Sequence, residues 1–131
     1  MLCRSRLFWM VLLGLYAAGL FALSSLSFDK LPASLAMGRL DQLVHAAEFA
    51  LFYLLARRAI GRTGTALLLT IVYAGSDEFH QIFVPARTAS FADFGCDLLG
   101  AFAAAFIRNQ LLTNGRRLIL ALRASGKERG T

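Results

Sequence analysis

The feature that most constrains the fold of this chain is an uncharged apolar run near its N-terminus, residues 7–26, LFWMVLLGLYAAGLFALSSL. At a helical rise of about 1.5 Å per residue, this run is long enough to cross the hydrocarbon core of a bilayer, which is about 30 Å thick. A signal peptide is the alternative, because MLCRSR supplies a basic start. The apolar core of a signal peptide is usually only about 7–15 residues long. We therefore favour a retained transmembrane helix.

Three further apolar stretches follow, at residues 43–59, 65–83 and 91–112, and each carries ionisable groups in one half only. Hydrophobic residues make up 57% of the chain and its mean hydropathy is +0.59, which is high for a soluble domain. The turns are short. The triplet Arg62-Thr63-Gly64 indicates one turn, Pro85 ends the third stretch, and Ser90-x-x-Asp93 resembles a capping box that opens the fourth. These patterns predict an all-α, polytopic membrane bundle of about four transmembrane helices.

The basic residues orient this bundle. With the N-terminus inside, eleven of the 14 Lys and Arg residues fall on the inner side, and only Lys30, Arg39 and Arg87 fall outside. The positive-inside rule then places both termini in the cytoplasm, as expected for a multi-pass protein of the cytoplasmic membrane. The net charge of +6 is explained by arginines beside apolar runs, so the expected partner is the bilayer and not nucleic acid. We divide the chain into a membrane domain, residues 1–112, and a basic cytoplasmic tail, residues 113–131.

The acidic residues are distributed in the opposite way, because seven of the eight fall in outer loops or in the outer halves of the spans. Residues three, four or seven apart share a face of a helix. Asp41, His45 and Glu48 therefore form one stripe. Two further stripes lie at similar depth. On the third stretch Asp77 shares a face with His80 and Gln81, and Glu78 is adjacent. On the fourth stretch Asp93 and Asp97 share a face that Gly100 and Ala104 continue as small residues, and Ser90 precedes this stripe. We expect these side chains, with Arg87, to line one shallow outer cavity.

Six acids around one fixed cation cannot all stay ionised in a buried site, so either some are protonated or a cation binds. A divalent cation would find its ligands among His45, Glu48, Asp77 and Asp97. Purely structural readings remain open: Asp41 and Asp93 as helix-capping residues, His45 in an interhelical hydrogen bond, Arg87 as a loop anchor, or the whole cluster as a polar network that joins the helices.

The stretches LDQLVHAAEFALFYLL and SDEFHQIFVPARTASFADFGCDLLGA resemble the motifs of the VanZ-like family of bacterial membrane proteins. The resemblance covers residues 41–104, and most of the polar positions listed above fit it. Gln42, Ala86 and Asp97 depart from it, and Asp97 stands where the family usually carries Asn. The family's namesake is associated with resistance to the glycopeptide teicoplanin. The resemblance therefore implies a multi-span protein with an outward-facing polar site that acts at the cell envelope.

Three functions follow as hypotheses. The first is binding of an envelope ligand, a lipid headgroup or a cell-wall precursor, with an effect on glycopeptide susceptibility. The second is a metal-dependent intramembrane hydrolase or transferase acting on lipid-linked substrates. The third is a proton- or cation-coupled transporter. Binding ranks above catalysis, because only Ser76 and Ser90 are candidate nucleophiles near a base. The sequence does not predict an oligomeric state.

Overall fold

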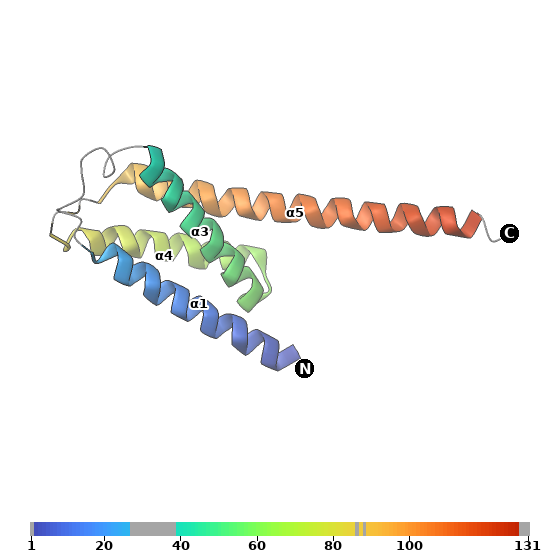
Figure 1. Ribbon diagram of the computed structural model, residues 1–131, viewed down its shortest axis with the longest axis horizontal. Coiled ribbons are helices and arrows are strands. Elements are labelled where there is room, and N and C mark those ends of the chain that lie inside the picture. The colour runs from blue at the N-terminus through green and yellow to red at the C-terminus, as the bar shows by residue number, and fades with distance from the viewer. Residues whose placement is uncertain (1, 27–38, 86, 88, 129–131) are drawn as a thin grey trace.

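The fold was analysed in a computed structural model that describes residues 2–26, 39–85, 87 and 89–128 (Figure 1). Four helices are present in these residues: α1 (Leu2–Ser24), α3 (Arg39–Ile60), α4 (Thr63–Gln81) and α5 (Phe91–Glu128). The description excludes the side chains at residues 2–4, 39–41, 121, 123, 124 and 126–128. The prediction of an all-α chain with four helices is confirmed.

Only α1, among the described helices, combines the length and the apolar composition needed to cross a bilayer. Its candidate span, Ser5–Ser24, has a mean hydropathy of 2.0 and is only 11% buried within the protein. Leu7, Phe8 and Leu15 are exposed along it, as expected for side chains that face lipid. The charged side chains of α3, α4 and α5 lower the hydropathy of those helices, and the four-span arrangement stays a prediction for them.

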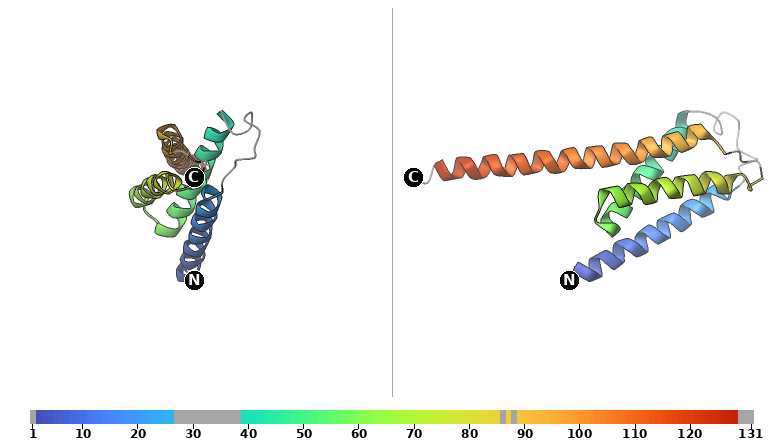
Figure 2. Two further views of the ribbon diagram at one scale, coloured as in Figure 1. Left: turned by 90° about the vertical axis from the view of Figure 1, so that its left-hand side faces the viewer. Right: turned by 180° about the vertical axis from the view of Figure 1, so that it is seen from behind.

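Helix α3 is the centre of the bundle, because it packs against α1, α4 and α5 (Figure 2). The core contains large aromatic side chains of α3, Phe52 and Tyr53, facing alanines of α4 and α5 such as Ala66 and Ala101. Two tyrosine hydroxyls form hydrogen bonds that join α1 to α3 and to α4. The Tyr16 hydroxyl donates to the Glu48 carbonyl at 3.1 Å, and the Tyr73 hydroxyl donates to the Ala17 carbonyl at 2.5 Å.

Helices α3 and α5 touch backbone to backbone at Gly100. A Cβ atom built on this glycine would lie 1.9 Å from the Ala46 carbonyl oxygen and 2.8 Å from the Ala46 Cα. Small residues allow such an approach between helices, and they also let two polar faces meet. The sequence placed Gly100 on the stripe that includes Asp97, and the structure shows that this stripe faces α3.

At the opposite end of the bundle from Arg87, α3 turns into α4 through residues 61 and 62. Gly61 has a φ of +84°, which a residue with a side chain rarely adopts, and its N–H donates to the Arg57 carbonyl at 3.1 Å. The predicted turn at 62–64 therefore overlaps the observed turn only at Arg62, because Thr63 and Gly64 already belong to α4. Arg6 of α1 caps the end of α3, because its guanidinium donates to the Ala59 and Ile60 carbonyls at 3.0 and 3.2 Å.

Helix α5 does not end at Leu112, where the predicted span ends, but continues to Glu128 and projects past the other helices (Figure 1). Residues 113–128 contain no proline and several strong helix formers, and the helix continues through the Asn114-Gly115 pair, a sequence that often ends helices. The tail thus continues the axis of α5 as a helical arm. The division of the chain at residue 112 into a membrane domain and a cytoplasmic tail stays a prediction.

Candidate functional site

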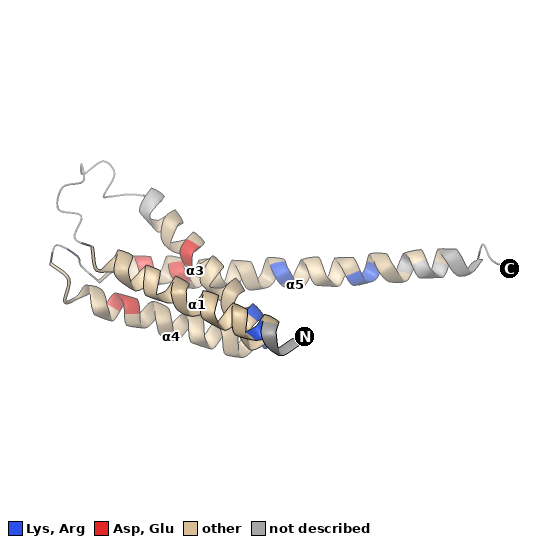
Figure 3. Cartoon of the chain, turned by 60° about the horizontal axis from the view of Figure 1, so that its bottom comes forward, with Lys and Arg blue, Asp and Glu red and all other residues tan. Residues whose placement is uncertain are grey.

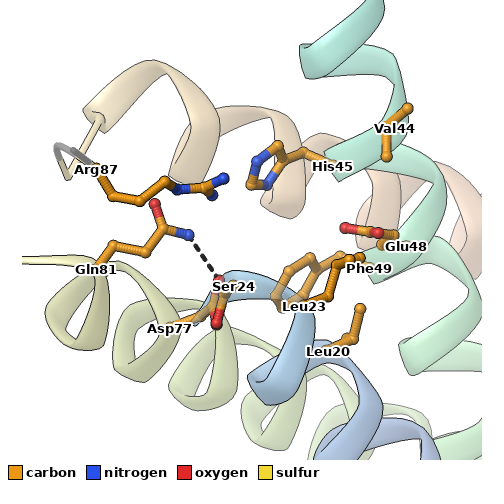
Figure 4. A pocket seen from close by; sticks show the side chains of 10 residues that line it. All are labelled: Leu20, Leu23, Ser24, Val44, His45, Glu48, Phe49, Asp77, Gln81 and Arg87. Carbon is orange, nitrogen blue, oxygen red and sulfur yellow. Dashed lines mark hydrogen bonds between the residues drawn. The ribbon is translucent and has the colours of Figure 1, made fainter. Parts of the chain in front are cut away.

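A pocket of about 170 Å³ lies between α1, α3 and α4, near the loop that joins α4 to α5 (Figure 4). Asp and Glu gather toward this end of the bundle, whereas the described Lys and Arg side chains other than Arg87 lie at the opposite end and along α5 (Figure 3). The pocket has a polar wall and an apolar wall. The polar wall consists of Ser24, His45, Glu48, Asp77, Gln81 and Arg87, and the apolar wall of Leu20, Leu23, Val44 and Phe49.

Helix α4 contributes Asp77 and Gln81, which lie one turn apart and therefore share a face. Gln81 Nε2 donates to Asp77 Oδ2 at 3.0 Å, and both side chains are buried. The other carboxylate oxygen, Asp77 Oδ1, is buried without a hydrogen-bond partner in the described part of the chain. A buried carboxylate oxygen without a hydrogen-bond partner is costly unless a ligand or water donates to it. Asp77 Oδ1 therefore favours a binding role for this residue over simple packing.

Helix α3 contributes His45 and Glu48, and the His45 ring is hydrogen-bonded to Asp97 of α5. The distance from His45 Nδ1 to Asp97 Oδ1 is 3.1 Å, and the Asp97 side chain is fully buried. A carboxylate on one ring nitrogen fixes the orientation of an imidazole and leaves the other nitrogen for another partner. Asp97 itself does not line the pocket. It orients the His45 ring, which does.

Arg87 enters from the α4–α5 loop, and its guanidinium extends across the pocket toward His45 (Figure 4). Among the described residues, no carboxylate lies within ion-pair distance of it; the single such contact is the His45–Asp97 pair. Among the described residues, the pocket lining therefore contains two carboxylates and one guanidinium. With His45 neutral, these described groups carry a formal charge of −1, and Glu78, Asp93 and Asp97 are not among them.

Three other predicted site residues, Glu78, Ser90 and Asp93, lie where α4 meets the start of α5. The Ser90 hydroxyl accepts from the Asp93 N–H at 3.3 Å, so Ser90 caps α5 as predicted. In a standard capping box the third residue of the helix would accept the N–H of the capping residue. Here Glu78 of α4 takes that role: its Oε2 accepts from the Ser90 N–H at 2.7 Å. Glu78 thereby joins the end of α4 to the start of α5.

Replacing Glu78 with alanine is expected to loosen the start of α5. The Ser90 N–H would lose its side-chain acceptor, and leaving a buried donor unpaired costs about 1–3 kcal/mol. Amide hydrogen exchange at Ser90 should accelerate in E78A, while E78Q, which retains a side-chain oxygen, should keep most of the protection. Equal protection of this amide in E78A and the wild-type protein would contradict the assigned role.

The metal hypothesis gains no geometric support from the described residues, in which no three His, Cys, Asp or Glu side chains gather closely enough to hold an ion. The side chain of Asp41, one of the acids expected at the site, lies outside the described residues. Of the two candidate nucleophiles, Ser76 is exposed and donates to the Tyr73 carbonyl at 2.7 Å. The Ser90 hydroxyl accepts the Asp93 N–H as a helix cap. Neither serine is among the residues that line the pocket.

The contribution of α1 to the pocket was not predicted from the sequence. Leu20, Leu23 and Ser24 all line the pocket, although this helix was interpreted only as a transmembrane span. One signal could have found it, because Ser24 and Ser25 are the two serines of an otherwise apolar run. Ser25 lies 2.9 Å from His80 Nε2, and this contact places the end of α1 beside the end of α4.

The fold and the pocket together describe a small helical bundle with a polar site buried at one end and an apolar first helix. The family model for VanZ/LLP1 matches residues 4–112, which is well over half of the chain. This chain therefore belongs to the VanZ/LLP1 family, whose members are membrane proteins. Searches of the curated proteins and of the solved structures gave no match.

Proposed function

We propose that the chain is a multi-pass protein of the bacterial cytoplasmic membrane, with four spans and both termini in the cytoplasm. Three observations support this topology. The family is one of membrane proteins, α1 is apolar and exposed, and successive helices run in opposite directions (Figure 1). In addition, the described Lys and Arg side chains other than Arg87 lie away from the pocket end of the bundle (Figure 3), as the positive-inside rule requires for an outward-facing pocket.

We further propose that the pocket binds the headgroup of an envelope lipid or of a lipid-linked cell-wall precursor. The observation that carries this proposal is the Arg87 guanidinium, which extends into the pocket with no carboxylate at ion-pair distance among the described residues. A guanidinium offers several N–H donors in a fixed plane that matches a phosphate or a carboxylate. An arginine that faces a pocket without a carboxylate at ion-pair distance among the described residues favours an anionic group on the ligand.

The remaining side chains define what such a ligand carries besides the anion. Gln81 and His45 can hydrogen-bond polar oxygens, and the Asp77 and Glu48 carboxylates favour hydroxyl or ammonium donors close to the anion. The apolar wall, with Leu20, Leu23 and Phe49, suits an attached hydrocarbon chain. A lipid phosphate bearing hydroxyl or amino groups meets all three requirements. Capture of such a lipid at the outer surface would change how a glycopeptide such as teicoplanin reaches its target.

Replacing Arg87 with alanine is expected to weaken ligand binding about 10- to 100-fold, because a hydrogen bond to a charged group contributes about 1.5–3 kcal/mol. Binding of a short-chain phospholipid or polyprenyl phosphate to purified protein in mild detergent, followed by calorimetry, measures this. Cells that express R87A should also lose any change in teicoplanin susceptibility that the wild-type protein confers.

Two controls make this test specific. Arg62 lies in the turn between α3 and α4 and is exposed, so R62A should bind the probe lipid as the wild-type protein does. D77N removes a carboxylate of the pocket but keeps an acceptor for Gln81, and should alter the preference among headgroups without unfolding the protein. If R87A and D77N both bind like the wild-type protein and leave susceptibility unchanged, the proposal is wrong.

A further inference from the structure

A second cavity lies between α3 and α5, on the side of the bundle away from the polar pocket. It is an open groove of about 710 Å³, within the range of about 300–1,000 Å³ that is typical of ligand sites. Its floor consists of small side chains, including Ala50 and Ala104, beside the glycine that brings the two helices together. Its rims carry the larger exposed side chains Leu54 and Ile107.

The two ends of this groove differ in charge. One end starts at Ala46 and Gly100 and is apolar, whereas the other end contains Arg58, Arg108 and Trp9. Arg58 stacks on the Trp9 ring at 5.3 Å from its centroid. Arg108 is half-buried and has no ion-pair partner in the part of the chain that the structure describes. The groove is therefore amphipathic along its length.

The length of the groove matches half of a bilayer. From Ala46 to Arg58 is twelve residues along α3, or about 18 Å of helix. One leaflet contributes about 15 Å to the hydrocarbon core. In the topology proposed above, the arginine end lies at the cytoplasmic surface, where a tryptophan is also favoured, and the apolar end lies near the midplane.

We propose that this groove holds an anionic phospholipid of the inner leaflet, with its phosphate at Arg58 and Arg108 and one acyl chain along the alanine floor. Charge complementarity selects this occupant over a second copy of the chain, because two copies of the groove would bring like-charged arginines together. Two other arginines at this end are already engaged within the protein. Arg6 caps α3, and Arg57 donates to the Thr63 hydroxyl at 3.1 Å.

The proposal rests on the proposed topology but not on the outer pocket, and Trp9 allows a direct test because it is the single tryptophan of the chain. The full-length protein is reconstituted in vesicles of phosphatidylcholine that contain a small fraction of phosphatidylglycerol with brominated acyl chains. Bromine quenches tryptophan fluorescence at short range, so quenching reports occupancy of the groove. Brominated phosphatidylcholine at the same fraction measures contact with unselected lipid.

Each arginine is expected to favour the anionic lipid about fivefold. Brominated phosphatidylglycerol should therefore quench Trp9 at a several-fold lower fraction than brominated phosphatidylcholine. The variant R108Q should lose about fivefold of this preference; Arg58 is unsuitable because its own contact with Trp9 affects the fluorescence. The control R117Q changes an exposed arginine of α5 outside the groove and should retain the preference.

Three results would overturn the proposal. Equal quenching by the two brominated lipids would mean that the groove does not select an anionic headgroup. A dimer in which Trp9 is shielded from both lipids would assign the groove to a second copy of the chain. No quenching by either lipid, with a monomer present, would show that α1 does not lie in the bilayer, and the topology would fail as well. If no lipid bound at Arg87 in the outer pocket, the quenching expected for this groove would not change.

Discussion

Replacing Gly100 with alanine is expected to disrupt the packing of α5 against α3. The added Cβ would lie 1.9 Å from the carbonyl oxygen of Ala46 and 2.6 Å from its carbonyl carbon. These are backbone atoms that cannot rotate away, so the two helices would have to separate along their whole contact. Overpacking a core typically destabilises a protein by about 1–3 kcal/mol, and a contact with rigid backbone belongs at or above the upper end of that range. Thermal unfolding in mild detergent should show a large drop in the midpoint for G100A.

Gly95 provides the matched control, because it lies in the same helix and a Cβ built there meets no atom within 4 Å. Alanine is favoured over glycine inside a helix by about 0.5–1 kcal/mol, so G95A should be as stable as the wild-type protein or slightly more stable. Separation of α3 from α5 would also move His45 away from Asp97, and G100A should therefore lose headgroup binding as well. A G100A variant with wild-type stability would show that the close approach of these helices is not required.

Replacing Asp97 with alanine is expected to have the second large effect. Asp97 is fully buried and its Oδ1 lies 3.1 Å from His45 Nδ1, so its removal deletes this buried hydrogen bond. The expected destabilisation is about 1–3 kcal/mol if the pair is a neutral hydrogen bond. It is about 3–5 kcal/mol if the pair is ionised. The free energy of unfolding of D97A in detergent, measured by denaturant titration, distinguishes the two states.

The variant D97N is the matched control, since an amide fills nearly the same volume and its oxygen still accepts from the imidazole. Asparagine is also the residue that the VanZ-like motif usually carries at this position. D97N should retain most of the stability and the headgroup binding that D97A loses. If D97A and D97N are equally destabilised, the charge of Asp97 matters more than its hydrogen bond. If neither is destabilised, the buried pair does not hold His45 in place.

Much of the secondary structure could be predicted from the sequence because apolar runs, prolines and caps are local signals. Pro85 follows the end of α4, and Ser90 stands at the start of α5 where its hydroxyl accepts the Asp93 N–H. The arm of α5 beyond Leu112 was not predicted as helix. The expected boundary followed from hydropathy, which reports where a bilayer would end, whereas a helix ends only where its own residues stop it.

Part of the pocket lining could be predicted from the sequence, but the arrangement of its side chains could not, and their role as a site stays a prediction. Helical spacing correctly placed His45 with Glu48 and Asp77 with Gln81 on shared faces, and all four line one pocket. Spacing cannot show how helices are rotated against one another. For that reason the sequence could not separate Glu78, which holds the cap of α5, from Asp77 one residue earlier, which lines the pocket.

The sequence by itself determined the helical class, the family and the segregation of acids and arginines to opposite ends, because these depend on residue types and their order along the chain. Only the tertiary structure decided which polar groups meet. Gly100 brings α5 so close to α3 that Asp97 reaches His45, while the α4–α5 loop directs Arg87 into the pocket. Both results depend on contacts between residues more than forty positions apart or on a loop conformation, and no local pattern encodes either.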